Sequence, residues 1–319
     1  MDSAEFIKIK DFGKGMSVTG FYLVKDMNIK LSANNKKYGD YTLADDTGEM
    51  NAKMWDVADE EAIPRAGDII KAQGLVTEWQ GSLQLRIDKF RPYSSSDPVD
   101  ITAIIPSAPY RPEDMMETIR QYVSRIDNAD IKSLTVRALD EFAERLRLHP
   151  AALKNHHSIR SGLLYHTTTM LRLADGVMEI YDFLNKSLLY AGVILHDLCK
   201  ITEIEAGDAG VAVDYSTRGM LLGHIAQGVA YLEKIGGELG TDPEILMMLQ
   251  HMMLSHHYEP EYGSPRRPMF PEAEILHYLD MIDTRMYDMQ KALEGVPPGS
   301  FTDKMWTLHN RKLYKKTFL

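Results

Sequence analysis

Hydrophobic and polar residues alternate over short runs in the first 95 residues, whereas further on the hydrophobic residues recur with helical spacing. The first pattern predicts five strands, at 18–31, 41–43, 50–55, 69–77 and 83–87. Turn-forming residues separate these runs, and a short helix is expected at 57–62. Five short strands are typical of a small closed barrel such as an OB-fold, although an SH3-like barrel would produce a similar pattern.

Serine and proline residues mark the boundary between the two patterns, so a linker is expected at 96–112. Beyond it, the spacing predicts helices at 113–126, 130–146, 161–182, 187–199, 218–235, 242–257 and 271–292. The sequence therefore predicts a multi-domain α and β protein. A small OB-like β-barrel is expected at 1–95 and an all-α domain at 113–319.

The composition indicates a globular protein of the cytoplasm that does not enter a membrane. No run approaches eighteen apolar residues, and the N-terminus lacks an export signal. The single cysteine, Cys199, has no partner for an internal disulfide, which fits a reducing compartment. The formal net charge of -10 argues against strong non-specific binding to duplexes, but it leaves single-stranded nucleic acid open as a partner.

Potential metal ligands follow one another along the helical part: His166, His196, Asp197, His224, His256, His257 and Asp280. Imidazole and carboxylate groups bind divalent transition metals, and converging helices can bring them together. The pair His196-Asp197 follows an apolar run, so both side chains should lie at the edge of the core. Asp197 could then bridge two ions that clamp a phosphate and activate water. A lone histidine is usually structural, as expected for His149, His251 and His309, so the prediction depends on the order of the whole set.

Several local sequences resemble the HD superfamily of metal-dependent phosphohydrolases and, within it, the YhaM family of 3'-5' exoribonucleases. These sequences lie at 155–157, 162–167, 195–200, 223–224, 254–257, 263–265 and 279–283. The barrel in front of them and the C-terminal residues at 301–315 extend the resemblance over nearly the whole chain.

The resemblance implies a set of metal ligands that consists of His166, His196, Asp197, His224, His256 and Asp280. Related HD enzymes differ in whether both histidines of a pair bind metal, so the role of His257 stays open. His277 and Asp283 each lie three residues from Asp280 and are expected to orient ligands. One or two divalent ions would bind, with Mn2+ (manganese) as the first choice and Fe2+ or Co2+ as alternatives, because the ligands mix nitrogen and oxygen.

Asp197 and Lys200 are expected to be catalytic, since the lysine lies three residues further on and could neutralise a phosphate oxygen. A solvated lysine that interacts with the helix dipole would give the same pattern. Four further side chains are expected to bind substrate: His156, His157, Arg266 and Arg267. The arginines lie in a proline-braced loop, which suits bidentate phosphate contacts but also an ordinary surface turn.

In the barrel, Lys53, Trp55 and Arg86 are expected to contact nucleic acid. OB-folds hold single strands with aromatic faces that stack on bases and with cations that flank the backbone, although small barrels also need aromatic residues in their cores. The C-terminal tail is the most basic segment and would either contact nucleic acid or be a solvated end. Its cations include Arg311, Lys312, Lys315 and Lys316.

Three functions fit these residues. The leading hypothesis is a metal-dependent 3'-5' exoribonuclease that releases nucleoside monophosphates from single-stranded RNA, with single-stranded DNA as a further substrate. The first alternative is an HD phosphohydrolase of a free nucleotide or cyclic dinucleotide, and the second is a nucleic-acid-binding protein that does no chemistry. The intact ligand set argues against the second alternative. Because HD enzymes often assemble, the resemblance also implies a homo-oligomer.

Overall fold

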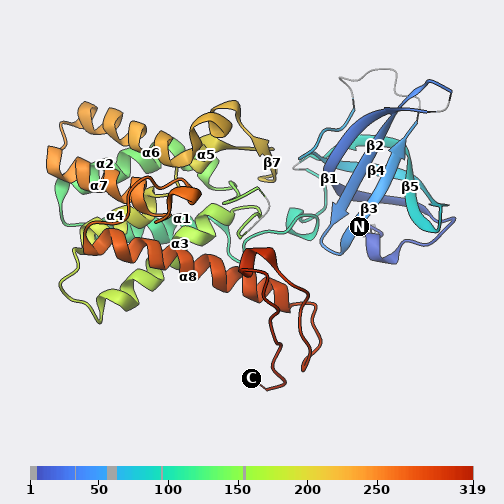
Figure 1. The fold of residues 1–319 in the computed structure, drawn as a ribbon. Coiled ribbons are helices and arrows are strands. Elements are labelled where there is room, and N and C mark those ends of the chain that lie inside the picture. The colour runs from blue at the N-terminus through green and yellow to red at the C-terminus, as the bar shows by residue number, and fades with distance from the viewer. Residues whose placement is uncertain (1–5, 33, 56–62, 95, 154–155, 319) are drawn as a thin grey trace. The chain divides into compact units, whose positions relative to one another are not determined.

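The computed structural model describes residues 6–32, 34–55, 63–94, 96–153 and 156–318, and the chain divides into two compact units (Figure 1). One unit comprises Met1–Ser107 with Ala206–Val213, and the other comprises Ala108–Glu205 with Asp214–Leu319. Each unit has a hydrophobic core of its own. Among the described residues, no helix combines the length and the apolar character needed to cross a membrane.

The first unit is a closed five-stranded barrel with the strand order β1-β2-β3-β5-β4. The strands are β1 Ser17–Leu31, β2 Lys37–Asp45, β3 Gly48–Met54, β4 Ile69–Trp79 and β5 Ser82–Pro92. All pairings are antiparallel except that of β3 with β5, which closes the barrel. The predicted barrel is confirmed, while the short helix expected at 57–62 lies outside the described residues.

Alternation along the strands sends large side chains into the barrel. Tyr22, Tyr41, Leu43 and Leu85 are each at most 1% exposed and belong to the same core cluster. Two of the aromatic residues of this unit, Tyr22 and Tyr41, are therefore structural, because their rings are buried in the core and cannot stack on a base. Two short helices also lie in this unit: η1 Ile9–Asp11 and η2 Ile101–Ala103.

The second unit is mainly helical. Its helices are α1 Pro112–Ser124, α2 Ala129–Leu146, α3 Gly162–Met178, α4 Lys186–Leu195, α5 Lys200–Glu203, α6 Thr217–Leu239, α7 Pro243–Ser255 and α8 Pro271–Leu293. Two 3-10 turns, η3 Pro260–Tyr262 and η4 Trp306–Leu308, follow α7 and α8. The mainly helical character confirms the prediction, but two short paired strands, β6 Ile204–Ala206 and β7 Ala212–Tyr215, interrupt the run of helices along the chain. The division between the two units falls within both strands. These strands are too short to produce a recognisable alternation.

Helix α4 forms the centre of this unit. Every residue from 187 to 195 is buried, and the helix packs against α2, α3, α7 and α8. A helix that is apolar on all sides is stable only when other helices surround it. The end of α4 therefore opens directly onto the interior of the helical unit, where the candidate site lies.

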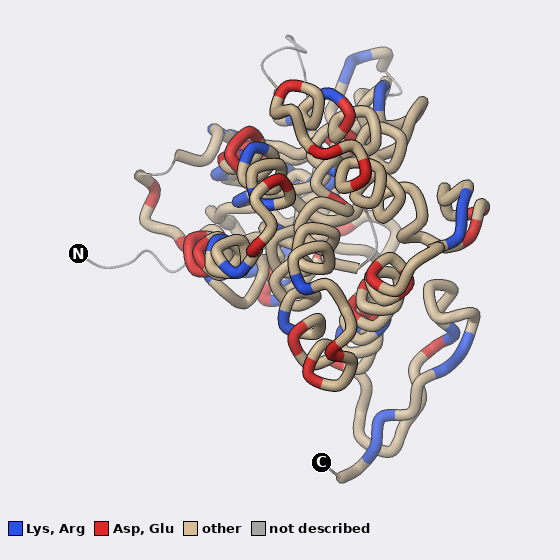
Figure 2. The backbone as a smooth tube through the Cα atoms, turned by 90° about the vertical axis from the view of Figure 1, so that its left-hand side faces the viewer, with Lys and Arg blue, Asp and Glu red and all other residues tan. Residues whose placement is uncertain are grey.

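The C-terminal segment, residues 294–318, leaves the end of α8 and turns back on itself. Antiparallel bridges join Phe301 to Tyr314 and Met305 to Arg311. Lys315 Nζ donates hydrogen bonds to the carbonyl oxygens of Leu293 (2.8 Å) and Glu294 (3.4 Å), at the end of α8. Lysine and arginine residues recur along this segment in the backbone view (Figure 2).

Candidate metal centre

Two histidines of the site lie where helices end. His196 follows the last residue of α4, and its Nδ1 donates to the carbonyl oxygen of Val193 at 2.8 Å. His256 follows the last residue of α7 and makes the same contact with the carbonyl oxygen of Met253, at 2.7 Å. The last carbonyl groups of a helix have no intrahelical partner, so they are available to fix an imidazole ring in this way.

The other histidines are oriented by contacts from outside their own helices, two of them from distant parts of the chain. His166, on α3, donates through Nδ1 to Asp283 Oδ2 at 2.7 Å. His224 follows a kink in α6 at Gly223, whose φ of 65° favours glycine, and donates through Nδ1 to Glu203 Oε2 at 2.9 Å. His257 donates through Nδ1 to the carbonyl oxygen of Tyr262 at 2.6 Å.

These contacts fix the tautomer of all five rings. Carbonyl and carboxylate oxygens only accept hydrogen bonds, so the proton of each neutral imidazole lies on Nδ1 and Nε2 carries a lone pair. The Nε2 atoms of His166 and His196 are 3.4 Å apart, as are those of His224 and His256. Lone pairs that face each other at this distance repel unless a proton or a cation lies between them.

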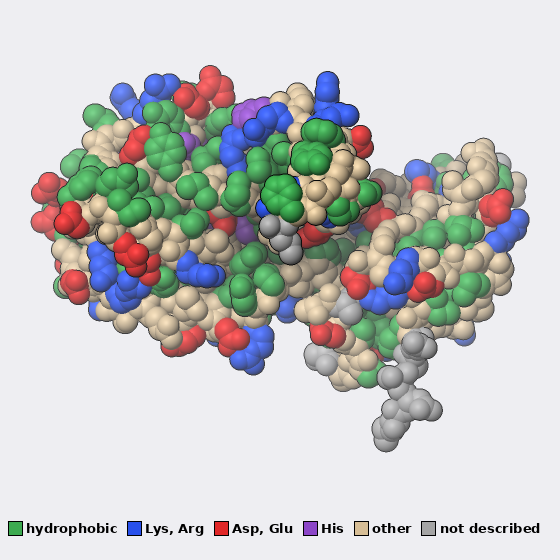
Figure 3. Space-filling view, turned by 90° about the horizontal axis from the view of Figure 1, so that it is seen from below, with side chains coloured by type: hydrophobic (Ala, Val, Ile, Leu, Met, Phe, Trp, Pro, Cys, Tyr) green, Lys and Arg blue, Asp and Glu red, His purple; other side chains and the backbone are tan. Residues whose placement is uncertain are grey.

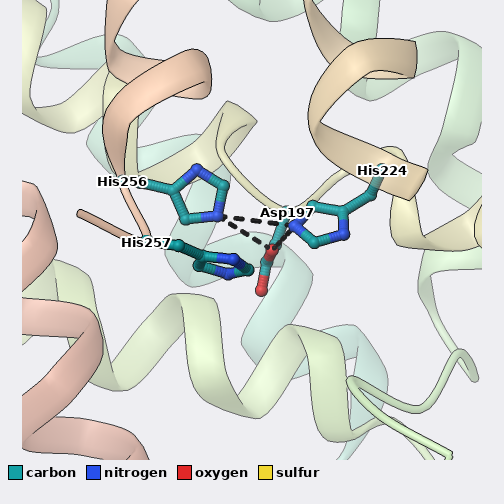
Figure 4. Close-up of side chains that lie close together, drawn as sticks. All are labelled: Asp197, His224, His256 and His257. Atoms are coloured by element: carbon teal, nitrogen blue, oxygen red, sulfur yellow. Dashed lines mark hydrogen bonds and ion pairs between the residues drawn. The ribbon is translucent and has the colours of Figure 1, made fainter. Parts of the chain in front are cut away.

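Asp197 lies at the centre of this group. Its Oδ2 is 3.4 Å from His196 Nε2 and 3.8 Å from His166 Nε2, and its Oδ1 is 3.3 Å from His224 Nε2 and 3.7 Å from His256 Nε2. Figure 4 shows Asp197, His224, His256 and His257 pointing toward one another. Asp197 thus belongs to two groups of potential ligands, one with His166 and His196 and one with the other three histidines.

The residues of this cluster fit a bound divalent cation. Asp197 Oδ1 is buried and has no hydrogen-bond partner within the described chain, a costly state for a carboxylate oxygen. His166, His196, His224 and His256 are each at most 7% exposed. A cation would satisfy the orphaned oxygen and the converging lone pairs at once, which no group of the described chain does. Asp280 Oδ1, 3.4 Å from His166 Nε2, adds a second carboxylate.

Comparisons with known proteins agree with this geometry. The HD domain family matches residues 163–285, and the OB-fold nucleic acid binding domain family matches residues 23–93. The "3'-5' exoribonuclease YhaM" of Geobacillus sp. (strain WCH70) is 40% identical over 95% of this chain and 93% of its own length. The protein of the same name in Bacillus subtilis (strain 168) is 40% identical over 95% of this chain and 96% of its own length.

The chain belongs to the YhaM family. The predicted resemblance is confirmed, and the HD domain implies that this protein binds a divalent metal. A domain of replication protein A from Methanococcus maripaludis aligns with 28% of this chain and 98% of its own, at 26% identity and a TM-score of 0.25.

In this YhaM-family chain, Lys200 lies directly beside the candidate metal-binding cluster. Its Nζ is 2.7 Å from Asp197 Oδ2, and the residue is 8% exposed. Burial alone would lower the pKa of Lys200, but the negative charges of Asp197 and Asp280 outweigh burial and raise it. The ammonium group therefore stays charged next to the cluster.

Asp283 and its neighbours form a layer behind His166. Asp283 Oδ2 accepts hydrogen bonds from His157 Nε2 and His166 Nδ1, both at 2.7 Å. Burial would raise the pKa of Asp283, yet these two bonds lower it, so the residue is a carboxylate. His157 contacts Asp283 and stacks on Tyr287, with ring centroids 4.0 Å apart. The ring of His157 therefore supports His166 through Asp283. The structure records no contact between His157 and Asp197.

Two further histidines lie close to the cluster. Burial lowers the pKa of His156 to about 3, so its imidazole is neutral, and the charges of Lys200 and Asp280 also act on it. His277 donates through Nδ1 to the carbonyl oxygen of His256 at 2.8 Å. His277 thus holds the backbone of His256, a candidate ligand, from a position one turn before Asp280 on α8.

The arginines of the 260–268 loop are on the surface. Arg267 Nη2 lies 3.0 Å and 3.2 Å from the two carboxylate oxygens of Glu259, and its guanidinium covers the ring of Tyr258. Arg266 is exposed. Glu259 therefore occupies the Nη2 donors of Arg267.

Glu203 is a functional residue that the sequence did not predict. It comes from the short helix α5, and besides binding His224 Nδ1 it accepts a hydrogen bond from the backbone N–H of His224 at 3.0 Å. α5 approaches α6 closely here, since a Cβ on Gly219 would lie 2.2 Å from the Glu203 carbonyl oxygen. A solitary glutamate 21 positions before its histidine has no recognisable spacing, so only the fold could reveal this pair.

On the barrel, the strand pairing brings the expected cations together. Lys53 and Arg86 are register partners on β3 and β5. Lys53 Nζ lies 4.9 Å from the ring centroid of Tyr38, whose ring is 4.7 Å from that of Trp55. Trp55 is 48% exposed, and Arg86 forms a 2.9 Å ion pair with Asp88. This arrangement gives the outer face of the barrel exposed aromatic surface next to positive charge.

Proposed function

We propose that this protein is a metal-dependent 3'-5' exoribonuclease that removes nucleoside monophosphates from single-stranded RNA. The observation that carries the proposal is the convergence of tautomer-fixed histidines on Asp197 in a chain of the YhaM family. Nucleic acid as the class of substrate follows from the OB-fold domain at 23–93. Single-stranded RNA as the substrate rests on the relatives' names and on the barrel's aromatic and cationic face.

We assign metal binding to His166, His196, Asp197, His224, His256 and Asp280, with His257 as a further ligand. A bound divalent ion, for which we propose Mn2+, would polarise the phosphodiester and lower the pKa of a nearby water. In the reaction, water oxygen bonds to phosphorus and the bond from phosphorus to the 3' oxygen of the preceding nucleotide breaks. A nucleoside monophosphate then leaves, and the shortened strand keeps a 3' hydroxyl.

The chain's own residues position the substrate. Lys200, held at 2.7 Å from Asp197, places a positive charge where a non-bridging phosphate oxygen would lie, and such a charge acts strongly in a buried site. Neutral His156 can donate a hydrogen bond to the ester. Behind them, Asp283 and Glu203 hold the rings of His166 and His224 in one orientation, so the ligand geometry is set before substrate arrives.

The barrel residues Lys53, Trp55 and Arg86 are assigned to binding the strand. Stacking of bases on aromatic rings stabilises complexes without regard to sequence, and the cations interact with the backbone phosphates. We accordingly assign binding to the barrel, 1–95, and chemistry to 113–319.

A substrate panel tests the proposal. The purified protein is incubated with single-stranded RNA, single-stranded DNA, a cyclic dinucleotide and free nucleoside triphosphates, each with Mn2+ and with chelator. Degradation of RNA only in the presence of metal is expected. Hydrolysis of the small nucleotides with no effect on RNA would instead make this chain a nucleotide phosphohydrolase, and binding without any hydrolysis would make it a binding protein.

A further inference from the structure

A cavity of about 370 Å³ lies between the last turns of α8 and the C-terminal segment. Its walls include Asp288 and Lys291 from α8, and Lys304, Met305 and Trp306 from the segment. This volume falls in the range of small-molecule pockets and is ample for a single nucleotide. We propose that the cavity binds one nucleotide of the single-stranded substrate upstream of the cleaved end, an inference that rests on the proposed function.

Trp306 supplies the surface that a base would occupy. Its side chain is 72% exposed, although tryptophan is among the side chains that gain most from removal from water. Other aromatic side chains of the segment are exposed as well, namely Phe301, Tyr314 and Phe318. An exposed indole at the rim of a cavity is what proteins use to stack an unpaired base, because every base offers a flat π face.

Charge favours a polyanion as the occupant. The lining carries two lysines, Lys291 from α8 and Lys304 from the segment, and one aspartate, Asp288, on the same helix as Lys291. Residues 301–319 carry five lysine and arginine side chains and one aspartate, in a chain whose formal net charge is -10. Figure 3 shows Lys and Arg side chains interspersed with hydrophobic ones on the side viewed from below, toward which the C-terminal segment extends in Figure 1.

A second copy of the chain is a poorer fit. A symmetric dimer uses the same patch of both copies, so basic segments that lie at the symmetry axis would repel each other. A nucleic acid strand instead brings one negative charge for each nucleotide and releases counterions when lysines replace them. The combination of an exposed indole with lysines therefore favours single-stranded nucleic acid over a protein surface.

Helix α8 contributes residues both to the cavity and to the candidate metal centre, so it gives the distance between them. Lys291 lies eleven residues after Asp280, so its side chain leaves the helix in nearly the same direction, roughly 16 Å further along the axis. A stacked strand rises by about 3.4 Å per nucleotide along its axis, so about five stacked nucleotides cover this distance. A stacked substrate shorter than this ends before the cavity, which makes the contribution of the cavity dependent on length.

The test compares a 20-nucleotide single-stranded RNA with a trinucleotide, using full-length Trp306→Ala, Trp306→Phe and the wild type. For the 20-mer, Trp306→Ala should raise KM by about 5- to 150-fold, because the stacking of one base is lost. The kcat should not change. Trp306→Phe should restore part of the affinity. The KM for the trinucleotide should not change. Phe183→Ala, which removes a comparably exposed ring (69%) elsewhere in the helical unit, should match the wild type on both substrates.

Several outcomes would overturn the inference. An unchanged KM of Trp306→Ala for the 20-mer would exclude the base stack, and an equal rise for both substrates would indicate a general defect. If Trp306→Ala lowered the sedimentation coefficient of the free protein, the cavity would hold a second copy instead of a nucleotide. A wild-type protein that degrades neither RNA would refute the proposed function itself, which keeps the two failures distinct.

Discussion

Removal of the Glu203 carboxylate should weaken metal binding without changing any ligand. Glu203 accepts hydrogen bonds from Nδ1 (2.9 Å) and from the backbone N–H (3.0 Å) of His224. Burial would raise the pKa of Glu203, but the hydrogen bond from His224 outweighs burial and lowers it, so the carboxylate is ionised. Carboxylates in this position orient the ring and increase its basicity, and their loss typically costs 10- to 100-fold in metal affinity.

For Glu203→Ala we expect the larger loss, about 100-fold or roughly 2.7 kcal/mol, because both hydrogen bonds disappear and a buried N–H is left unpaired. Glu203→Gln keeps one acceptor oxygen, so a loss nearer tenfold is expected. Isothermal titration of Mn2+ into the metal-free protein measures the dissociation constant directly. Circular dichroism and thermal melting of each variant check that the helical unit remains folded.

Glu205→Gln is the matched control, since Glu205 is two positions further along the chain and exposed. It should bind Mn2+ with the wild-type dissociation constant. If folded Glu203→Ala and Glu203→Gln proteins also bound Mn2+ as tightly as the wild type, the hydrogen bonds would not orient a ligand, and the assignment of His224 to the metal would lose its main support.

Three further predictions follow from the same geometry. Lys200→Ala should lower kcat by at least tenfold at unchanged metal content, as measured by steady-state kinetics with elemental analysis; wild-type turnover would remove its catalytic role. The double variant Lys53→Ala and Trp55→Ala should raise KM for long RNA by about 5- to 150-fold and leave a small phosphodiester unaffected, whereas equal KM values on RNA would exclude this face. Leu189→Ala in α4, whose side chain is fully buried, should destabilise the helical unit by about 2–5 kcal/mol in chemical denaturation, and a smaller change would mean that the core relaxes around the cavity.

The sequence predicted the parts of this protein that depend on periodic burial. Strands of the barrel alternate, and helices such as α4 carry continuous apolar faces, so their existence could be read directly from the chain. The β6–β7 sheet could not, because a pairing of three or four residues depends on contacts instead of periodicity. The histidines of the cluster could be predicted because they follow one another along the chain in the same order as the ligands of the HD family.

The acceptors that orient those histidines were harder to foresee. Val193 and Met253 contribute backbone carbonyl groups, which leave no trace in residue type. Glu203 is one glutamate among many, and only the approach of α5 to α6 brings it to His224. Arg267 illustrates the opposite case, since its proline-braced loop suggested a phosphate clamp while the fold pairs it with Glu259.

The central claim is that this chain removes nucleotides from the 3' end of RNA by chemistry centred on Asp197. The most direct test follows two versions of one single-stranded RNA, labelled at the 5' or the 3' end, during digestion with Mn2+ by the wild type and by folded Asp197→Asn. The wild type should release the 3' label at once as a mononucleotide and shorten the 5'-labelled strand one nucleotide at a time, and Asp197→Asn should do neither. Early loss of the 5' label, internal fragments, or wild-type rates for Asp197→Asn would contradict the claim.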